Sequence, residues 1–400
     1  MFDEMSTKPT YRWVILGLGW LVYFSFGMVS SSLPPLVSTI REELDLTFSQ
    51  FGAVLGAWPL TYIAVAYVEG MLIDRFGIRK SVALAGLLLS LSAFLRSLAW
   101  DYVTLFIAVA VFGLGGPMVS IGLPKSIAVW FSGRERGTAT GIYITGLAVG
   151  SSFALAVTSS LVSHLAGSWR NTFLAYSIGA VLVAGLWYVL GRDSPDIADT
   201  NEAVNRTSKD VFREALRNRN VWLVVIVGFA GFMTNHGLRS WLPTVFELQS
   251  MTSVEAGVLA SVPMLAGMLG SICINRVSAQ LTSRKPVLLA LLATTGVGIL
   301  LMGTSSGPVL WAIAIVYGFC SGALLPLLML VLMDMRDVGK EHMAAAGGLY
   351  FTVGEIGGFG GPSIMGYIND RTGSFLPSFV VFSILTEMML IPTFILEERR

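Results

Sequence analysis

Charged residues are scarce in this chain of 400 residues. Asp, Glu, Lys and Arg make up 13% of it, whereas soluble globular proteins carry about 25%, so the charges are too few to cover a water-facing surface. Its two cysteines, Cys273 and Cys320, both lie in apolar segments, which implies no disulfide framework. The sequence contains no nucleotide-binding loop, metal-ligand spacing or catalytic-triad signature, so we expect no enzyme, cofactor, metal or nucleic-acid function.

Apolar residues make up 54% of the chain, and the mean hydropathy is +0.71. They form repeated blocks long enough to cross a bilayer as helices, which takes about 20 residues. Barrel strands are excluded because they alternate and run for only about ten residues. The first block is too long for a cleaved signal peptide and is interpreted as a span. We predict an all-α polytopic membrane protein with twelve spans near 13–40, 48–73, 81–98, 103–131, 137–165, 171–191, 220–246, 253–279, 285–304, 308–333, 344–368 and 375–396.

The spans divide into two sets of six, separated by the one long polar stretch. The expected domains are an N-terminal six-helix bundle over 1–191, a cytoplasmic linker over 192–219 and a C-terminal six-helix bundle over 220–400. Apolar residues at helical spacing in the linker favour an amphipathic helix on the membrane surface; a plain linker is the alternative. They are Val211, Phe212, Ala215 and Leu216.

Basic residues are distributed unevenly between the two sides of these spans. If the N-terminus is cytoplasmic, 20 of the 26 Lys and Arg residues fall on the cytoplasmic side. This positive-inside bias predicts that both termini lie in the cytoplasm and that the protein is in the cytoplasmic membrane.

The two halves also carry an internal repeat. Arg79-Lys80 opens the third span, and Arg284-Lys285 opens the ninth, 205 positions later. Gly113 and Gly318 match at the same offset. Parallel repeats of this kind are typical of transporters whose halves are related by an axis along the membrane normal.

The loop between the second and third spans carries a specific motif. It reads Gly70-Met-Leu-Ile-Asp74-Arg75-Phe-Gly77-Ile-Arg79-Lys80. This run resembles the G-x-x-x-D-R-x-G-x-R-K signature of the major facilitator superfamily at every defining position. The resemblance implies two six-helix bundles around a central cavity, which opens alternately to the two sides of the membrane.

A conformational latch is the role that the resemblance implies for this motif. It comprises Gly70, Asp74, Arg75, Gly77, Arg79 and Lys80. Asp74 is expected at the N-terminal end of span 11, where the helix dipole favours a carboxylate, so that it holds the cytoplasmic side closed. The alternative is that the basic residues only follow the positive-inside bias.

Shorter segments resemble particular branches of the superfamily. Leu33-Pro34-Pro35-Leu36 and Trp241-Leu242-Pro243 are similar to the cyanate and nitroimidazole transporter-like branch, and the run 361–373 is similar to organic-anion members. The pattern of the drug–proton antiporters in the fourth span is absent. Those proteins carry an arginine four residues before a glycine, whereas this chain has Val109 four residues before Gly113.

Ionisable residues inside spans are costly and are therefore candidate functional residues. Asn235, His236 and Arg239 cluster in the seventh span. Arginine offers a planar fork for a carboxylate, and histidine can titrate near neutral pH. We expect these three to bind an anionic substrate, with His236 also able to carry a proton. Arg239 could instead extend to the headgroups.

Glu355 is the best acid candidate, near the middle of the eleventh span. A carboxyl group held away from water is a candidate carrier of the coupled proton; the alternative is a packing residue among Gly354, Gly357 and Gly358. The other expected substrate-binding residues are Lys125, Tyr23 and Tyr143. Snorkelling is the alternative for the lysine, and packing for the tyrosines.

These features together predict a secondary transporter for a small organic anion such as a carboxylate, driven by proton symport and acting as a monomer in the lipid bilayer. Proton-coupled efflux of lipophilic or nitroaromatic compounds and uniport are the alternatives.

Overall fold

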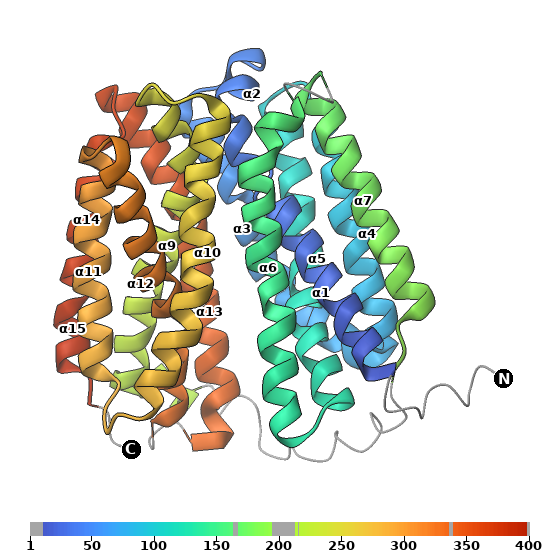
Figure 1. The fold of residues 1–400 in the computed structure, drawn as a ribbon. Helices are drawn as coiled ribbons and strands as arrows, with labels where there is room; N and C mark the ends of the chain where they lie inside the picture. Colours follow the sequence, from blue (N-terminus) through green and yellow to red (C-terminus); the bar gives the residue numbers. More distant parts are fainter. Residues whose placement is uncertain (1–10, 163–166, 194–212, 215, 336–338, 398–400) are drawn as a thin grey trace. The chain divides into compact units, whose positions relative to one another are not determined.

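The computed structural model describes residues 11–162, 167–193, 213–214, 216–335 and 339–397, and these form helices without any strand (Figure 1). The long helices are α1 (Tyr11–Ser30), α3 (Phe48–Phe76), α4 (Ile78–Ser97), α5 (Tyr102–Trp130), α6 (Gly133–Leu161), α7 (Trp169–Leu190), α9 (Arg219–Leu248), α10 (Ser253–Ala279), α11 (Lys285–Thr304), α12 (Gly307–Asp334) and α13 (Gly339–Thr372). Shorter ones are η1 (Pro34–Leu36), α2 (Val37–Glu43), α14 (Leu376–Met388) and α15 (Leu390–Ile395).

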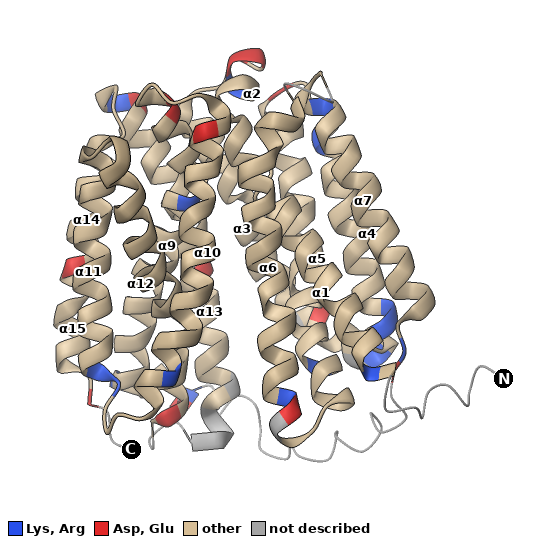
Figure 2. Ribbon diagram, viewed as in Figure 1, with Lys and Arg blue, Asp and Glu red and all other residues tan. Residues whose placement is uncertain are grey.

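Most of these helices suit a bilayer. Among the described residues, eleven segments are long and apolar enough to cross a membrane. Each of the twelve predicted spans contains a long helix or, at the C-terminus, the pair α14 and α15. Charged residues gather near helix ends, while the middle parts of the helices are largely uncharged (Figure 2). The prediction of an all-α polytopic membrane protein is therefore confirmed.

Two predicted spans are not single helices. The span 13–40 is interrupted after Ser30, because Pro34 and Pro35 lack the N–H groups that would continue α1, and a 3₁₀ turn leads into α2 instead. The span 375–396 is divided at Met389, and Pro392 lies in the first turn of α15, where its missing N–H is tolerated.

Helix starts follow from local sequence. Asp101 caps α5, because its carboxylate accepts the Thr104 N–H at 2.8 Å. In return, the Thr104 hydroxyl oxygen accepts the Asp101 N–H at 3.1 Å. Thr252 and Glu255 make the same reciprocal box at α10. The expected amphipathic linker helix lies largely outside the described residues, since 194–212 and 215 are not among them.

The chain divides into two compact units. The first comprises residues 1–44 and 57–203, and the second comprises 45–56 and 204–400. The first unit buries large aromatic side chains, among them Phe112, Trp169, Phe173 and Trp187. It also buries Arg96, whose guanidinium donates to the Val29 carbonyl at 2.8 Å and lies over the Phe112 ring.

The second unit has an aliphatic core built by α9, α11, α12 and α13, including Val225, Leu288, Leu328 and Val331. The segment 45–56, which starts α3, belongs to this unit. Asp370, near the end of α13, caps the first turn of α3. The Asp370 carboxylate accepts the Phe48 N–H at 3.0 Å and the Ser49 N–H at 2.7 Å.

Candidate functional site

Helices α9 and α13 approach each other closely through glycine. A methyl group on Gly361 would lie 2.0 Å from the Met233 carbonyl oxygen, and one on Gly357 would lie 2.5 Å from the Phe229 carbonyl oxygen. Only a residue without Cβ fits at such a distance. The contact brings the side chains on the two facing surfaces within reach of one another.

The facing surfaces pair two of the ionisable residues predicted from the sequence. The imidazole Nε2 of His236 on α9 lies 3.8 Å from the carboxyl Oε2 of Glu355 on α13. Both side chains are largely buried, with 14% and 9% of their surfaces exposed. The distance is within ion-pair range but too long for a hydrogen bond, and Glu355 Oε2 has no hydrogen-bond partner among the described residues.

Arg239 follows His236 by three residues on α9, so the two lie on one side of the helix. It is half-buried and close enough to His236 for a direct electrostatic interaction. The second unit therefore contains a base, an acid and a permanent cation within one small region.

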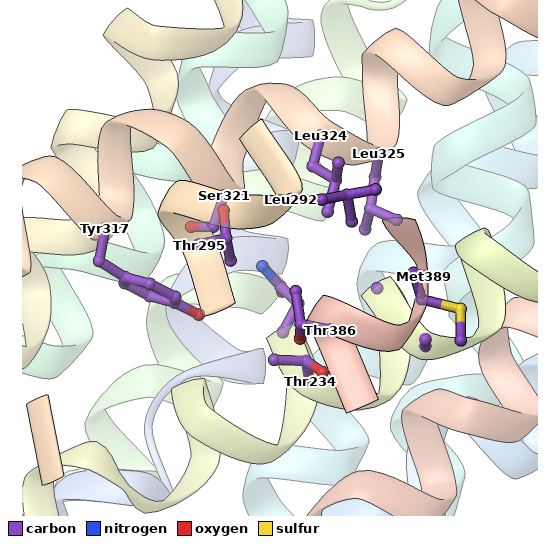
Figure 3. A pocket seen from close by; sticks show the side chains of 12 residues that line it. Thr234, Leu292, Thr295, Tyr317, Ser321, Leu324, Leu325, Thr386 and Met389 are labelled. Atoms are coloured by element: carbon purple, nitrogen blue, oxygen red, sulfur yellow. The ribbon is translucent and has the colours of Figure 1, made fainter. Parts of the chain in front are cut away.

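Asn235 lies elsewhere. It lines a small cavity inside the second unit, with room for about one water molecule, between α9, α11, α12 and α14. The lining includes the buried hydroxyls of Thr234 and Thr295, which have no hydrogen-bond partner among the described residues (Figure 3). Neither His236 nor Glu355 lines this cavity.

The candidates in the first unit form a separate, mainly aromatic group. The rings of Tyr23 on α1 and Tyr143 on α6 meet edge to face, with centroids 5.2 Å apart. Phe26 continues this group towards Trp58 and Phe112. Lys125 is half-buried on α5, one residue after Pro124.

The loop motif is held in place within the first unit. Gly77 has a φ of 83°, a conformation that favours glycine, and it caps α4. Arg79 donates from its backbone N–H to Asp193 at 2.9 Å and from Nε to the Tyr188 carbonyl at 2.7 Å. The backbones of Gly70, Asp74, Arg75 and Lys80 lie in α3 and α4, and the side chain of Asp74 is outside the described set.

Sequence reasoning missed one buried acid. Glu69 on α3 is only 4% exposed, and its carboxyl Oε2 accepts the Met118 N–H of α5 at 3.0 Å. The signal was present, since Glu69 falls within the predicted span 48–73, one residue before the loop motif.

Two helical units with ionisable groups inside long apolar helices are features that polytopic transport proteins commonly have. A sequence profile described as Major Facilitator Superfamily matches residues 19–362. The chain belongs to this superfamily, as the loop motif predicted, and it is a transporter rather than an enzyme.

Several relatives cover nearly the whole chain at low identity. A hexuronate transporter of Bacillus subtilis is 25% identical over 374 residues, covering 88% of this chain and 86% of its own. A probable L-galactonate transporter of Escherichia coli is 26% identical and covers 89% and 83%. A probable sulfoacetate transporter of Cupriavidus necator is 26% identical and covers 94% and 92%.

The fold also matches solved structures. A bacterial homolog of the human lysosomal transporter Spinster superimposes with a TM-score of 0.73 at 18% identity, covering 96% of this chain and 95% of its own. At this identity the likeness establishes the fold alone.

Proposed function

We propose that this protein moves a small organic anion bearing a carboxylate, with sugar acids as the preferred class, across the cytoplasmic membrane by proton symport. The observation that carries the proposal is the buried pair of His236 and Glu355, 3.8 Å apart, beside Arg239. Transport follows alternating access in a monomer whose two termini lie in the cytoplasm.

Arg239 is the proposed anion-binding residue. Its planar guanidinium can donate two parallel hydrogen bonds to one carboxylate, and it keeps its positive charge at every physiological pH. His236 interacts with both this cation and Glu355, so it can orient the substrate or pass a proton. Lys125, Tyr23 and Tyr143 are proposed to line the substrate pathway and to shape selectivity, whereas Asn235, which lines the internal cavity, is left out of this proposal.

Charge balance gives the reason for coupling. With a monovalent anion bound to Arg239 and Glu355 ionised, the region carries one cation and two anions, a net charge of −1. Uncompensated charge within a membrane protein is costly. A proton taken up by Glu355 or His236 makes the loaded site neutral, so we propose that substrate and proton cross together.

The substrate class is supported by the relatives. Hexuronate and L-galactonate are sugar carboxylates, and sulfoacetate carries a carboxylate and a sulfonate. The loop motif is proposed to act as the latch implied by the family resemblance, with Asp74 favouring closure of the cytoplasmic side.

Counterflow in proteoliposomes tests the substrate class. Vesicles containing the purified full chain are loaded with a candidate compound and diluted into labelled glucuronate, and exchange reports that the compound is transported. Galacturonate and galactonate should drive exchange, whereas glucose, which has a hydroxymethyl group in place of the carboxylate of glucuronate, should not. Exchange with nitroaromatic compounds and none with any sugar acid would contradict the proposal.

A further inference from the structure

Among the described residues, Glu69 is the one strongly buried carboxyl that the proposed mechanism does not use. It lies in the first unit on α3, 4% exposed, and its described contact is the Met118 N–H of α5. It forms no ion pair with any described residue. Burying an ionised carboxylate without a cation costs several kcal/mol, so an acid at this position needs a reason.

The backbone contact alone does not supply that reason. Met118 follows Pro117, one of two prolines inside α5, and Glu69 Oε2 accepts the N–H at 3.0 Å. A glutamine would accept the same hydrogen bond through its amide oxygen without the cost of a buried charge. What the acid adds is the ability to bind and release a proton.

The titratable residues near Glu69 on the two helices that it joins are the following. On α3, Tyr62 lies two turns earlier and shares a hydrogen bond of 2.7 Å with Ser120 of α5. Asp74 and Arg75 follow on α3, and Lys125 lies seven residues after Met118 on α5. The Tyr62–Ser120 hydrogen bond joins α3 and α5, as the Glu69–Met118 hydrogen bond does, and Ser120 is two residues after Met118.

We propose that Glu69 carries a second proton in each transport cycle, so that two protons accompany each anion. This inference rests on the proposed symport and sets its stoichiometry. The Glu69 carboxylate forms an O–H bond with a proton from the side where substrate binds and releases that proton on the other side, as Glu355 does in the second unit. A monovalent anion then moves with a net charge of +1, and a divalent anion moves with none.

Membrane potential distinguishes one proton from two. Proteoliposomes of the full chain receive an inside-negative potential from a potassium gradient with valinomycin, and labelled glucuronate is compared with divalent galactarate. One net charge across about 100 mV corresponds to roughly a 50-fold change in accumulation ratio at most. We expect the potential to increase glucuronate accumulation towards that limit and to leave galactarate unchanged.

The variant E69Q keeps the acceptor for the Met118 N–H and removes only the titration. We expect it to retain counterflow and pH-driven glucuronate uptake but to lose the response to potential. E42Q, the same change at an exposed residue of α2, should behave as the wild type.

The outcomes separate this inference from the proposed function. If the wild type accumulates glucuronate with a pH gradient but ignores the potential, or if E69Q responds to it as the wild type does, the second proton is refuted and symport stands. If E69Q loses counterflow as well, Glu69 serves structure or binding, and the inference is overturned. If a pH gradient drives no uptake in the wild type, the proposed symport itself fails.

Discussion

The imidazole of His236 and the carboxyl of Glu355 face each other across the α9–α13 contact, with Nε2 and Oε2 3.8 Å apart. The two residues are 119 positions apart in the sequence, and the sequence predicts each of them separately as a candidate because it is an ionisable residue inside a span. Their proximity depends on the glycines that let the two helices approach.

Replacing Glu355 with Gln should separate transport from energy coupling. The amide keeps nearly the same shape but cannot carry a proton, so E355Q should exchange glucuronate in counterflow but accumulate less of it than the wild type in a pH gradient, because only the proton proposed for Glu69 remains coupled. Accumulation is measured in proteoliposomes with an inward proton gradient. Loss of counterflow together with accumulation would instead place Glu355 in folding or substrate contact.

Arg239→Lys tests whether the arginine binds the substrate or only extends towards the headgroups. Lysine keeps the charge and can still snorkel, but it lacks the planar fork for a carboxylate. Losing one charge-assisted hydrogen bond costs about 1.5–3 kcal/mol, so KM for glucuronate should rise roughly 10- to 100-fold. An unchanged KM in R239K with normal membrane insertion would favour the headgroup role.

Two neighbouring glycines on α13 form a matched pair for stability. A Cβ on Gly361 would lie 2.0 Å from the Met233 carbonyl oxygen, whereas a Cβ on Gly360 would meet only the Ile364 Cδ1 at 3.9 Å. G361A should therefore destabilise the second unit by about 1–3 kcal/mol, and G360A should be neutral or slightly stabilising. Thermal unfolding in detergent compares the two variants, and equal midpoints would argue against close α9–α13 packing.

Acid should weaken the cap on α3. Asp370 lies beyond the predicted span 344–368. Partial burial raises the pKa of Asp370, but hydrogen bonds from the Ser49 hydroxyl and from the Ser49 and Phe48 N–H groups outweigh this and hold the pKa below its ordinary value. A lowered pKa stabilises the folded protein above the ordinary aspartate value, about pH 4, and this contribution disappears as the pH falls below it.

The variant D370A removes the same contribution without a change of pH. We expect it to lose about 1 kcal/mol of stability at neutral pH, and to show a smaller further loss than the wild type between pH 5 and pH 3. Unfolding curves at both pH values check this. A loss on acidification as large as in the wild type would mean that other carboxylates account for it.

The helices were predictable because each predicted span is a long apolar segment with clear ends. The predicted spans 253–279 and 285–304 coincide with α10 and α11. The break at Pro34 was missed because hydropathy continues across it, although proline itself gave the signal. Side-chain partners were not predictable, since the His236–Glu355 distance depends on how closely two distant helices pack.

Asn235 illustrates the same limit. Asn235 is adjacent to His236 in the sequence, and the prediction therefore grouped the two residues. Neighbouring positions on a helix point about 100° apart, however, and Asn235 lines the internal cavity. Glu69 was missed because it directly precedes the loop motif. The motif explained the charged residues from Asp74 to Lys80, and Glu69 was not considered apart from them.

The most direct test of proton symport is the internal pH of proteoliposomes as glucuronate is added outside. A pH-sensitive dye is trapped in vesicles that contain the purified protein, with no gradient imposed at the start. We predict acidification of the interior that depends on glucuronate, is absent with glucose and is smaller per anion in E355Q than in the wild type. Entry of labelled glucuronate without any change in internal pH would contradict proton symport and indicate a uniporter.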